Sequence, residues 1–182
     1  MNQTALKNKI VPLLLLLLGM ILFFSTSAAA DSISRERLAG SDRYQTAIAI
    51  SQKGWETSQF AILARGDDFA DALCAGPLAH HYDAPILLTQ PGQMNPDTLN
   101  ELKRLQVRQV IITGGYGAVS KEVETALAAA GIADVKRISG ADRYETSAAI
   151  AEELGAKDQV VIATGTDFPD ALSISVIASG NE

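Results

Sequence analysis

Short apolar runs alternate with longer amphipathic segments through most of this chain. The runs that predict strands, because they are continuous and apolar as in strands buried on both faces, are 60–64, 85–89 and 110–113. The segments whose apolar spacing predicts helices are 42–53, 68–81, 95–105 and 120–130. Strands separated by helices pair in parallel through right-handed crossovers. The pattern therefore predicts an α/β fold with a Rossmann-like parallel sheet and flanking helices.

The ends of these helices carry recognisable signals. Ser41 or Asp42 is the expected N-cap of the first helix, and Asn95-Pro96 opens the third. Ser120 is expected to cap the fourth helix and Gly131 to end it. Within the second helix, Pro77 should produce a kink or an end, because proline cannot continue the hydrogen-bond ladder.

The chain also repeats itself. Residues 37–51, RLAGSDRYQTAIAIS, return at 137–151 as RISGADRYETSAAIA, and the pattern of 66–73 returns at 165–172. A period near 100 residues indicates a tandem repeat whose second copy is incomplete. We expect a first repeat over 37–133 and a truncated second repeat over 134–182.

The first 30 residues have the composition of a cleavable signal peptide. Lys7 and Lys9 precede an apolar run from Ile10 to Phe24, and Ala28-Ala29-Ala30 offers a cleavage site before Asp31. The run is shorter than the roughly 20 residues that span a bilayer. We therefore expect a secreted chain with a short linker at 31–36 and no stable membrane anchor after cleavage.

Charge and cysteine content restrict the partners. The formal net charge is −6, and it becomes −8 without the two lysines of the signal peptide. Such an acidic chain is not expected to bind nucleic acid or anionic membranes, which attract basic patches. Cys74 is the only cysteine and cannot form an intramolecular disulfide.

Three carboxylates follow the first predicted strand, at Asp67, Asp68 and Asp71. They suit a divalent metal or an acid–base pair, but Asp68 as N-cap and Asp71 at the third helical position explain them equally directly. The second repeat has Thr166 in place of Asp67. That replacement favours the capping interpretation and no bound metal.

The repeated polar residues are interpreted as structural. Arg43 and Arg143 suit an anionic ligand, although an ion pair with Asp68 or Asp71 of the same unit is the simpler role for Arg43. The residues assigned to the structural motif are Asp42, Arg43, Tyr44, Asp68, Asp71, Asp142, Arg143, Tyr144, Asp167 and Asp170.

A glycine-rich loop, 113–120, lies between a predicted strand and a predicted helix. It lacks the third glycine of a dinucleotide-binding loop and the Gly-Lys-Ser/Thr of a Walker loop, which favours a tight turn before Ser120. Its helix start leaves some affinity for a phosphate or carboxylate open. No catalytic frame of the common hydrolases occurs, so neither an active site nor a cofactor is expected.

These motifs in this order resemble the cell wall binding repeat 2 family of Gram-positive surface proteins. The resemblance is carried by RLAGSDRYQTAIAIS, GDDFADAL, APILLT and VIITGGYGAVS. It covers 37 to about 130 as one repeat and 137–182 as half of another. The family implies a non-catalytic α/β module, usually in three tandem copies. It implies noncovalent attachment to the wall through anionic secondary polymers such as teichoic-acid-like glycans.

The resemblance also implies a place for the ligand. The segment Pro85-Ile86-Leu87-Leu88 matches the family's PILL motif, which lies near the proposed polymer site, although its pattern alone predicts a core strand. An acidic domain that binds an acidic polymer needs a local basic groove or bridging cations. The further candidates for ligand binding are Arg65, Arg104, Arg108, Gly114 and Gly115.

Two alternatives remain open at this point. The chain suits the targeting part of a peptidoglycan hydrolase such as an N-acetylmuramoyl-L-alanine amidase, with the catalytic domain outside these residues. It also suits a secreted Rossmann-like enzyme that uses the acidic loop and a metal. The expected partners are an anionic wall polymer or peptidoglycan, and further repeats of the same family in a longer protein.

Overall fold

Four parallel strands form the sheet of this protein. The computed structural model describes residues 35–180, so the expected signal peptide at 1–30 lies outside the described residues. The strands are β1 (Phe60–Arg65), β2 (Ile86–Thr89), β3 (Gln109–Thr113) and β4 (Asp134–Ile138). Their order in the sheet is β2-β1-β3-β4, and every neighbouring pair is parallel. The predicted Rossmann-like sheet is confirmed.

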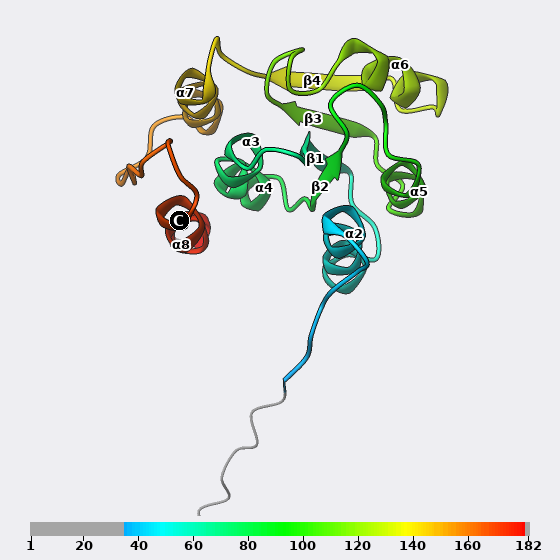
Figure 1. The fold of residues 1–182 in the computed structure, drawn as a ribbon, viewed down its shortest axis with the longest axis horizontal. Helices are drawn as coiled ribbons and strands as arrows, with labels where there is room; N and C mark the ends of the chain where they lie inside the picture. Colours follow the sequence, from blue (N-terminus) through cyan, green and yellow to red (C-terminus); the bar gives the residue numbers. More distant parts are fainter. Residues whose placement is uncertain (1–34, 181–182) are drawn as a thin grey trace, which may run out of the picture. The chain divides into compact units, whose positions relative to one another are not determined.

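Helices connect and cover the strands (Figure 1). Their bounds are α2 (Arg43–Gly54), α3 (Ala70–Leu73), α4 (Gly76–His81), α5 (Pro96–Arg104), α6 (Lys121–Ala129), α7 (Arg143–Leu154) and α8 (Pro169–Gly180). Within residues 35–180, no helix combines the length and the apolar character needed to cross a bilayer.

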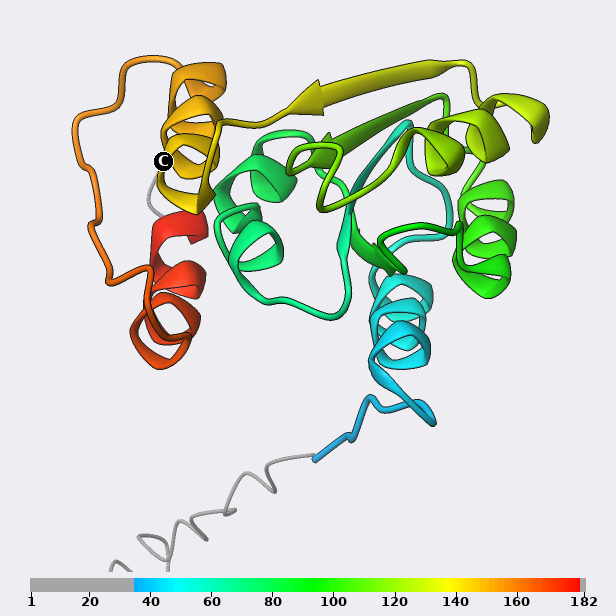
Figure 2. The ribbon, with the colours of Figure 1, turned by 45° about the horizontal axis from the view of Figure 1, so that its top comes forward.

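Each face of the sheet has its own core. Leu63 and Ile112 pack with side chains of α2, α5 and α6 on one face. Ile62 and Ile111 point to the other face, where α4 and α7 contribute the packing residues. Figures 1 and 2 show these two helical layers on either side of the strands. This division follows from the alternation of side chains along a strand.

Most predicted helix ends are confirmed. The Asp42 carboxylate accepts a hydrogen bond of 2.8 Å from the Gln45 amide, and Asn95 caps α5 through the amides of Asp97 and Thr98. Gly131 follows α6 with a φ of 91°, a conformation that glycine adopts without strain. Ser120 occupies the N-cap position of α6, but its side chain makes no capping hydrogen bond, which corrects the expected cap.

The segment 68–81, predicted to be helical with a kink or an end at Pro77, is interrupted, but the interruption lies just before Pro77. The structure has two short helices there, and Pro77 lies in the first turn of α4, where its missing N–H costs nothing. Phe69, not Asp68, holds the N-cap position of α3, and Asp71 is the second helical residue. In the second repeat Val176 replaces Pro77, and α8 runs through without a break.

The fourth strand was not predicted from the sequence. Asp134, Lys136 and Arg137 give β4 a charged appearance because it lies at the sheet edge and only Ile138 is buried. β4 pairs with β3 although its residues fall at the start of the expected second repeat. The boundary expected at 133/134 stays a prediction, but the first sheet extends across it.

Each repeat contains the same contact between its first helix and a later glycine, here called the Arg-Tyr-Gly contact. Arg43 donates to the Gly66 carbonyl oxygen, and a Cβ atom added to Gly66 would lie 2.5 Å from Cε1 of Tyr44. This corrects the expected role of Arg43, whose partner is a backbone carbonyl and not a carboxylate of its own unit. The second copy comprises Arg143, Tyr144 and Gly165, with an Arg143 Nη1 to carbonyl oxygen distance of 2.9 Å.

The second repeat has the contact but lacks the strand. Val160 and Ile162 correspond to residues inside β1, yet residues 155–164 form no helix or strand. The side chains of Val160 and Ile162 are 78% and 92% exposed. Without neighbouring strands, this apolar segment has neither ladder hydrogen bonds nor a covering layer.

Hydrogen exchange should distinguish these equivalent segments. Amides of residues 156–163 are expected to exchange orders of magnitude faster than those of β1, because only β1 has parallel partners on both sides. Exchange followed by mass spectrometry of peptides from the two segments measures the difference. Equally slow exchange in both would show that the second segment is paired in solution.

A glycine substitution should test the tight entry into α2. An added Cβ on Gly40 would lie 2.5 Å from the backbone carbon of Gln45, so Gly40→Ala should lower the free energy of unfolding by about 1–3 kcal/mol. Gly92 has open space around it, and Gly92→Ala should stay within about 0.5 kcal/mol of the parent. Urea denaturation of both variants measures the effect. Equal stabilities would show that the entry is loosely packed.

Candidate ligand-binding site

Arg65 ends β1 at the carboxyl edge of the sheet, where α/β proteins often bind ligands. Its guanidinium makes two hydrogen bonds of 2.7 Å to the carboxylate of Asp67, and this bonding lowers the pKa of Asp67. In the second repeat the equivalent residues, Thr164 and Thr166, share a hydroxyl hydrogen bond of 2.9 Å. The charged Arg65–Asp67 pair is therefore replaced in the second repeat by an uncharged pair of threonines that bridges the equivalent loop.

The three arginines proposed for a basic groove do not come together. Arg104 donates at 2.8 Å to both carboxylate oxygens of Glu101 and also bonds backbone carbonyls of residues 55 and 56. Arg108 immediately precedes β3, whereas Arg65 is the last residue of the parallel strand β1. The two arginines therefore lie at opposite ends of the strands. Their roles in ligand binding stay predictions, but the residues do not form one groove.

The PILL segment consists of Pro85 and the first three residues of the edge strand β2. Pro85 and Leu87 are buried, whereas Ile86 and Leu88 are only half-buried. The segment is thus a strand, as its pattern predicts, and the face of the sheet to which Ile86 and Leu88 point is less well covered than the other. Its proximity to a polymer site stays a prediction.

The glycine loop is a compact turn. Gly114 has a φ of 102°, its N–H donates to Ile138 O at 3.0 Å, and its carbonyl accepts from Arg137 at 2.7 Å. An added Cβ would collide with the carboxylate of Asp71. The Gly115 carbonyl accepts from the amides of residues 118 and 119. These contacts support the turn interpretation and leave both Gly114 backbone groups occupied.

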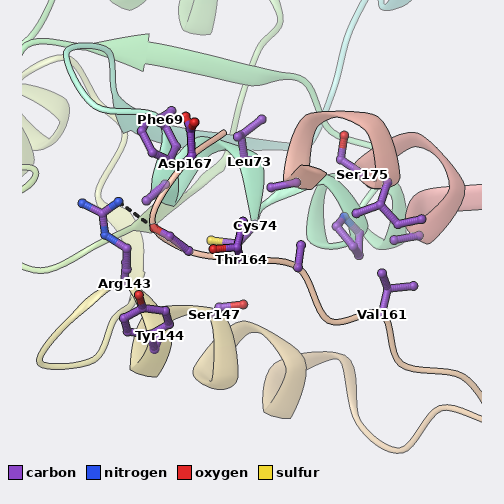
Figure 3. A pocket seen from close by; sticks show the side chains of 17 residues that line it. Phe69, Leu73, Cys74, Arg143, Tyr144, Ser147, Val161, Thr164, Asp167 and Ser175 are labelled. Carbon is purple, nitrogen blue, oxygen red and sulfur yellow. Dashed lines mark hydrogen bonds between the residues drawn. The ribbon is translucent and has the colours of Figure 1, made fainter. Parts of the chain in front are cut away.

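A pocket of about 190 Å³ lies between the two repeats (Figure 3). The first repeat contributes residues of α3, α4 and the preceding loop, and the second contributes α7, α8 and the segment between them. The lining residues used below are Phe69, Leu73, Cys74, Arg143, Tyr144 and Asp167. The pocket combines two aromatic rings with one arginine and several small side chains, so it offers both apolar and hydrogen-bonding surface.

Arg143 connects the two repeats at this pocket. Besides bonding Gly165, it lies 3.5 Å from Asp68 Oδ2, and its guanidinium carbon is 5.4 Å from the centroid of the Phe69 ring. The carboxylate of Asp68 is therefore paired across the repeats. The expected pairing within its own unit is wrong. Both side chains of this ion pair are about a third exposed. An arginine in this position can offer donors to an anionic group while aromatic surface lies beside it.

Two ionisable groups near the pocket are perturbed by burial. Desolvation, reinforced by the negative charge of Asp68, raises the pKa of the Asp71 carboxyl. Burial also raises the pKa of the Cys74 thiol to about 12, so the thiol is not a nucleophile at neutral pH. Among residues 35–180, no cluster of three or more histidine, cysteine or acidic side chains is arranged to hold a metal ion.

The architecture is that of an α/β repeat module with a pocket of about 190 Å³ between its repeats. The chain belongs to the family Cell wall binding domain 2 (CWB2), which matches residues 37–124 and 137–182. The resemblance seen in the sequence is thereby confirmed, and the chain is a cell wall binding module whose partner is a component of the wall. The family is a binding domain and not a catalytic one.

Known relatives agree with this assignment. The N-acetylmuramoyl-L-alanine amidase LytC of Bacillus subtilis is 37% identical over 97% of this chain, which covers 35% of the amidase. The amidase enhancer of the same organism is 38% identical over 80% of this chain and 20% of its own length. Cwp6 from Clostridium difficile shares the fold with a TM-score of 0.73 and 37% identity, over 84% of this chain and 26% of Cwp6. The chain thus spans about a third of these relatives or less.

Sequence reasoning named Arg143 but not its site. The spacing of the repeat makes Arg143 the equivalent of Arg43. The contact of Arg143 with Asp68, however, depends on how one repeat packs on the other. The available signal was that the same Asp-Arg-Tyr motif precedes an incomplete unit, which must cover its apolar surface against the first repeat. Phe69 and Tyr144 were likewise visible only as motif residues.

Asp71→Asn should reveal the cost of burying this carboxylate. Because its folded pKa is raised, the charged form is disfavoured in the folded state, and the variant should be more stable than the parent at pH 7. The difference should shrink as the pH falls toward the ordinary aspartate pKa of about 3.9 and vanish well below it, where the carboxyl is protonated in both states. Asp67→Asn is the control of opposite sign, because its pKa is lowered and its charge is stabilising at neutral pH. Thermal melts across pH 3–7 measure both, and a less stable Asp71→Asn at pH 7 would contradict the argument.

Proposed function

We propose that this chain attaches a secreted protein noncovalently to the wall by binding an anionic secondary polymer in the pocket between its repeats. The observation that supports this most directly is Arg143 beside Phe69 and Tyr144 on the pocket wall. Aromatic faces suit the apolar side of a sugar ring, and the guanidinium suits a phosphate or carboxylate of the chain. The expected signal peptide and cleavage belong to the same proposal.

The surroundings of Arg143 should make this binding weak. Asp68 lies 3.5 Å away and Asp167 also lines the pocket, so an incoming anion must compete with carboxylates. The chain without its signal peptide would carry a net charge of −8, which repels an anionic polymer at long range. Contacts between exposed charges are screened beyond about 10 Å at 0.1 M salt. Useful affinity would then come from several linked repeats, whose effective concentration can increase avidity roughly 100-fold or more.

A second function concerns the longer protein from which such a module would act. The match to the amidase LytC covers nearly all of this chain but only 35% of the amidase. This supports a role as the targeting part of a peptidoglycan hydrolase. The chain alone should then leave a peptidoglycan gel intact in a zymogram, and a clear lytic band from it would assign catalysis to these residues instead.

Pelleting with isolated Gram-positive walls tests the polymer proposal. Residues 31–182 should sediment with intact walls, and less protein should sediment after the anionic secondary polymers are extracted. Arg143→Gln should raise the dissociation constant about tenfold or more, since a charge-assisted contact contributes about 1.5–3 kcal/mol. Added salt should release the parent protein as well.

Arg108→Gln provides the matched control. It removes the same charge from an exposed side chain before the amino end of β3. Arg108 does not line the pocket. The control should bind like the parent. Equal binding to intact and extracted walls would replace the polymer with peptidoglycan as the ligand, and equal losses in both variants would reduce the role of Arg143 to net charge.

A further inference from the structure

Tyr116 presents an aromatic ring to solvent while an arginine holds one face of that ring. It lies in the glycine-rich loop, between Gly115 and Gly117, and is 60% exposed. The guanidinium carbon of Arg137 lies over the ring, 4.3 Å from its centroid. A tyrosine that remains so exposed with one face covered must present the opposite face to solvent.

Arg137 is itself firmly held. Its side chain, from β4, is only 13% exposed and donates to Oε1 of Glu124 in α6 at 2.6 Å and 3.0 Å. A third hydrogen bond, of 2.7 Å, goes to the Gly114 carbonyl at the start of the loop. The Gly115 carbonyl accepts from two amides farther along the same loop. The ring therefore has a rigid base, and little conformational entropy would be lost when a ligand binds its free face.

The surroundings of the ring suit a sugar better than a protein partner. A Cβ atom added to Gly115 or Gly117 would meet no atom of the described residues within 4 Å other than its chain neighbours, so the backbone beside the ring is open. Behind the ring lies the ion pair of Arg137 with Glu124, which has no net charge. Protein-binding hot spots lie in well-packed apolar pockets, whereas this ring is flanked by glycines and an ion pair.

We propose that the free face of Tyr116 stacks on a pyranose ring of a wall glycan. The apolar C–H face of the sugar would cover the aromatic face, and the sugar hydroxyls would stay in contact with water and the open backbone. Arg137 would hold the ring in the orientation that the sugar meets. The proposal rests on the proposed attachment to a wall glycan, but not on the role of Arg143.

This subsite is separate from the pocket but lies at the same edge of the sheet. Tyr116 does not line the pocket. The carboxylate of Asp71 in α3 lies against Gly114, and Phe69, directly before α3, lines the pocket. A glycan of several sugars could therefore contact both places. The two contacts should respond differently to salt, because a stacked sugar involves no charge pair, whereas the contact of Arg143 with an anion is screened.

Wall binding by Tyr116 variants of residues 31–182 tests the proposal. Tyr116→Ala should raise the dissociation constant for isolated Gram-positive walls about three- to tenfold, as much at high salt as at low salt, because it removes the aromatic face. Tyr116→Phe is the matched control: it keeps the ring and removes only the hydroxyl, so it should bind like the parent. Thermal melts establish that both variants are folded. Equal losses in both variants would assign the contact to the hydroxyl and overturn stacking.

Walls before and after extraction of the anionic polymers distinguish the source of the sugar. A loss caused by Tyr116→Ala on intact walls alone would assign the stacked sugar to the secondary polymer. The same loss on intact and extracted walls would assign it to the glycan strands of peptidoglycan. Unchanged binding of Tyr116→Ala to both kinds of wall would exclude the stacked sugar.

NMR of the tyrosine rings separates this proposal from the one on the pocket. The ring signals of Tyr116, assigned by their loss in Tyr116→Phe, should shift with the extracted polymer or with a soluble N-acetylglucosamine tetramer. Those of Tyr82, which is hydrogen-bonded to Glu153, should not shift. Shifts at Tyr116 together with wall binding that Arg143→Gln leaves unchanged would contradict the pocket proposal alone. Wall binding that depends on Arg143, with no shift at Tyr116 from either glycan, would overturn the stacking proposal alone.

Discussion

The contact between an arginine and a glycine carbonyl determines where the parts of each repeat lie. Arg43 reaches from the first turn of α2 to Gly66, directly after β1, and Tyr44 covers the same glycine. Only a residue without a side chain leaves room for the ring at that distance. The first helix is thereby attached to the loop that carries Asp67 and Asp68. The conformation of the acidic loop depends on this attachment.

The second copy shows that this contact does not need a finished sheet. Arg143 and Tyr144 hold Gly165 although residues 155–164 form no strand, so the helix and the loop make a local unit. That unit can pack against the first repeat because Ile150 finds an apolar surface on α4. The arginine then serves two purposes: Nη1 binds its own loop, and Nη2 approaches Asp68 of the neighbour.

The sequence predicted features that short segments determine by themselves. The three apolar strands, the Asp42 and Asn95 caps and the parallel order of strands and helices depend on local spacing. β4 escaped prediction because an edge strand tolerates charged residues such as Lys136, and its strand character comes from pairing with β3. The split of α3 from α4 was predicted as a kink or an end at Pro77, whereas the structure places Pro77 in the first turn of the second helix. The partner of Asp68 could not be predicted, because it lies in the other repeat and depends on packing.

The placement of charge constrains the proposed binding of an anionic wall polymer. The expected basic groove is not formed. Arg104 is bonded to Glu101 and Arg65 to Asp67, so both guanidinium groups already have carboxylate partners. Arg143 differs in that its carboxylate partner is more distant, at 3.5 Å, and its face lies over Phe69. An anion can displace a long, partly exposed pair more easily than a bidentate one. Recognition in an acidic protein would thus depend on the shape and donors of one pocket, and not on the field of the whole molecule.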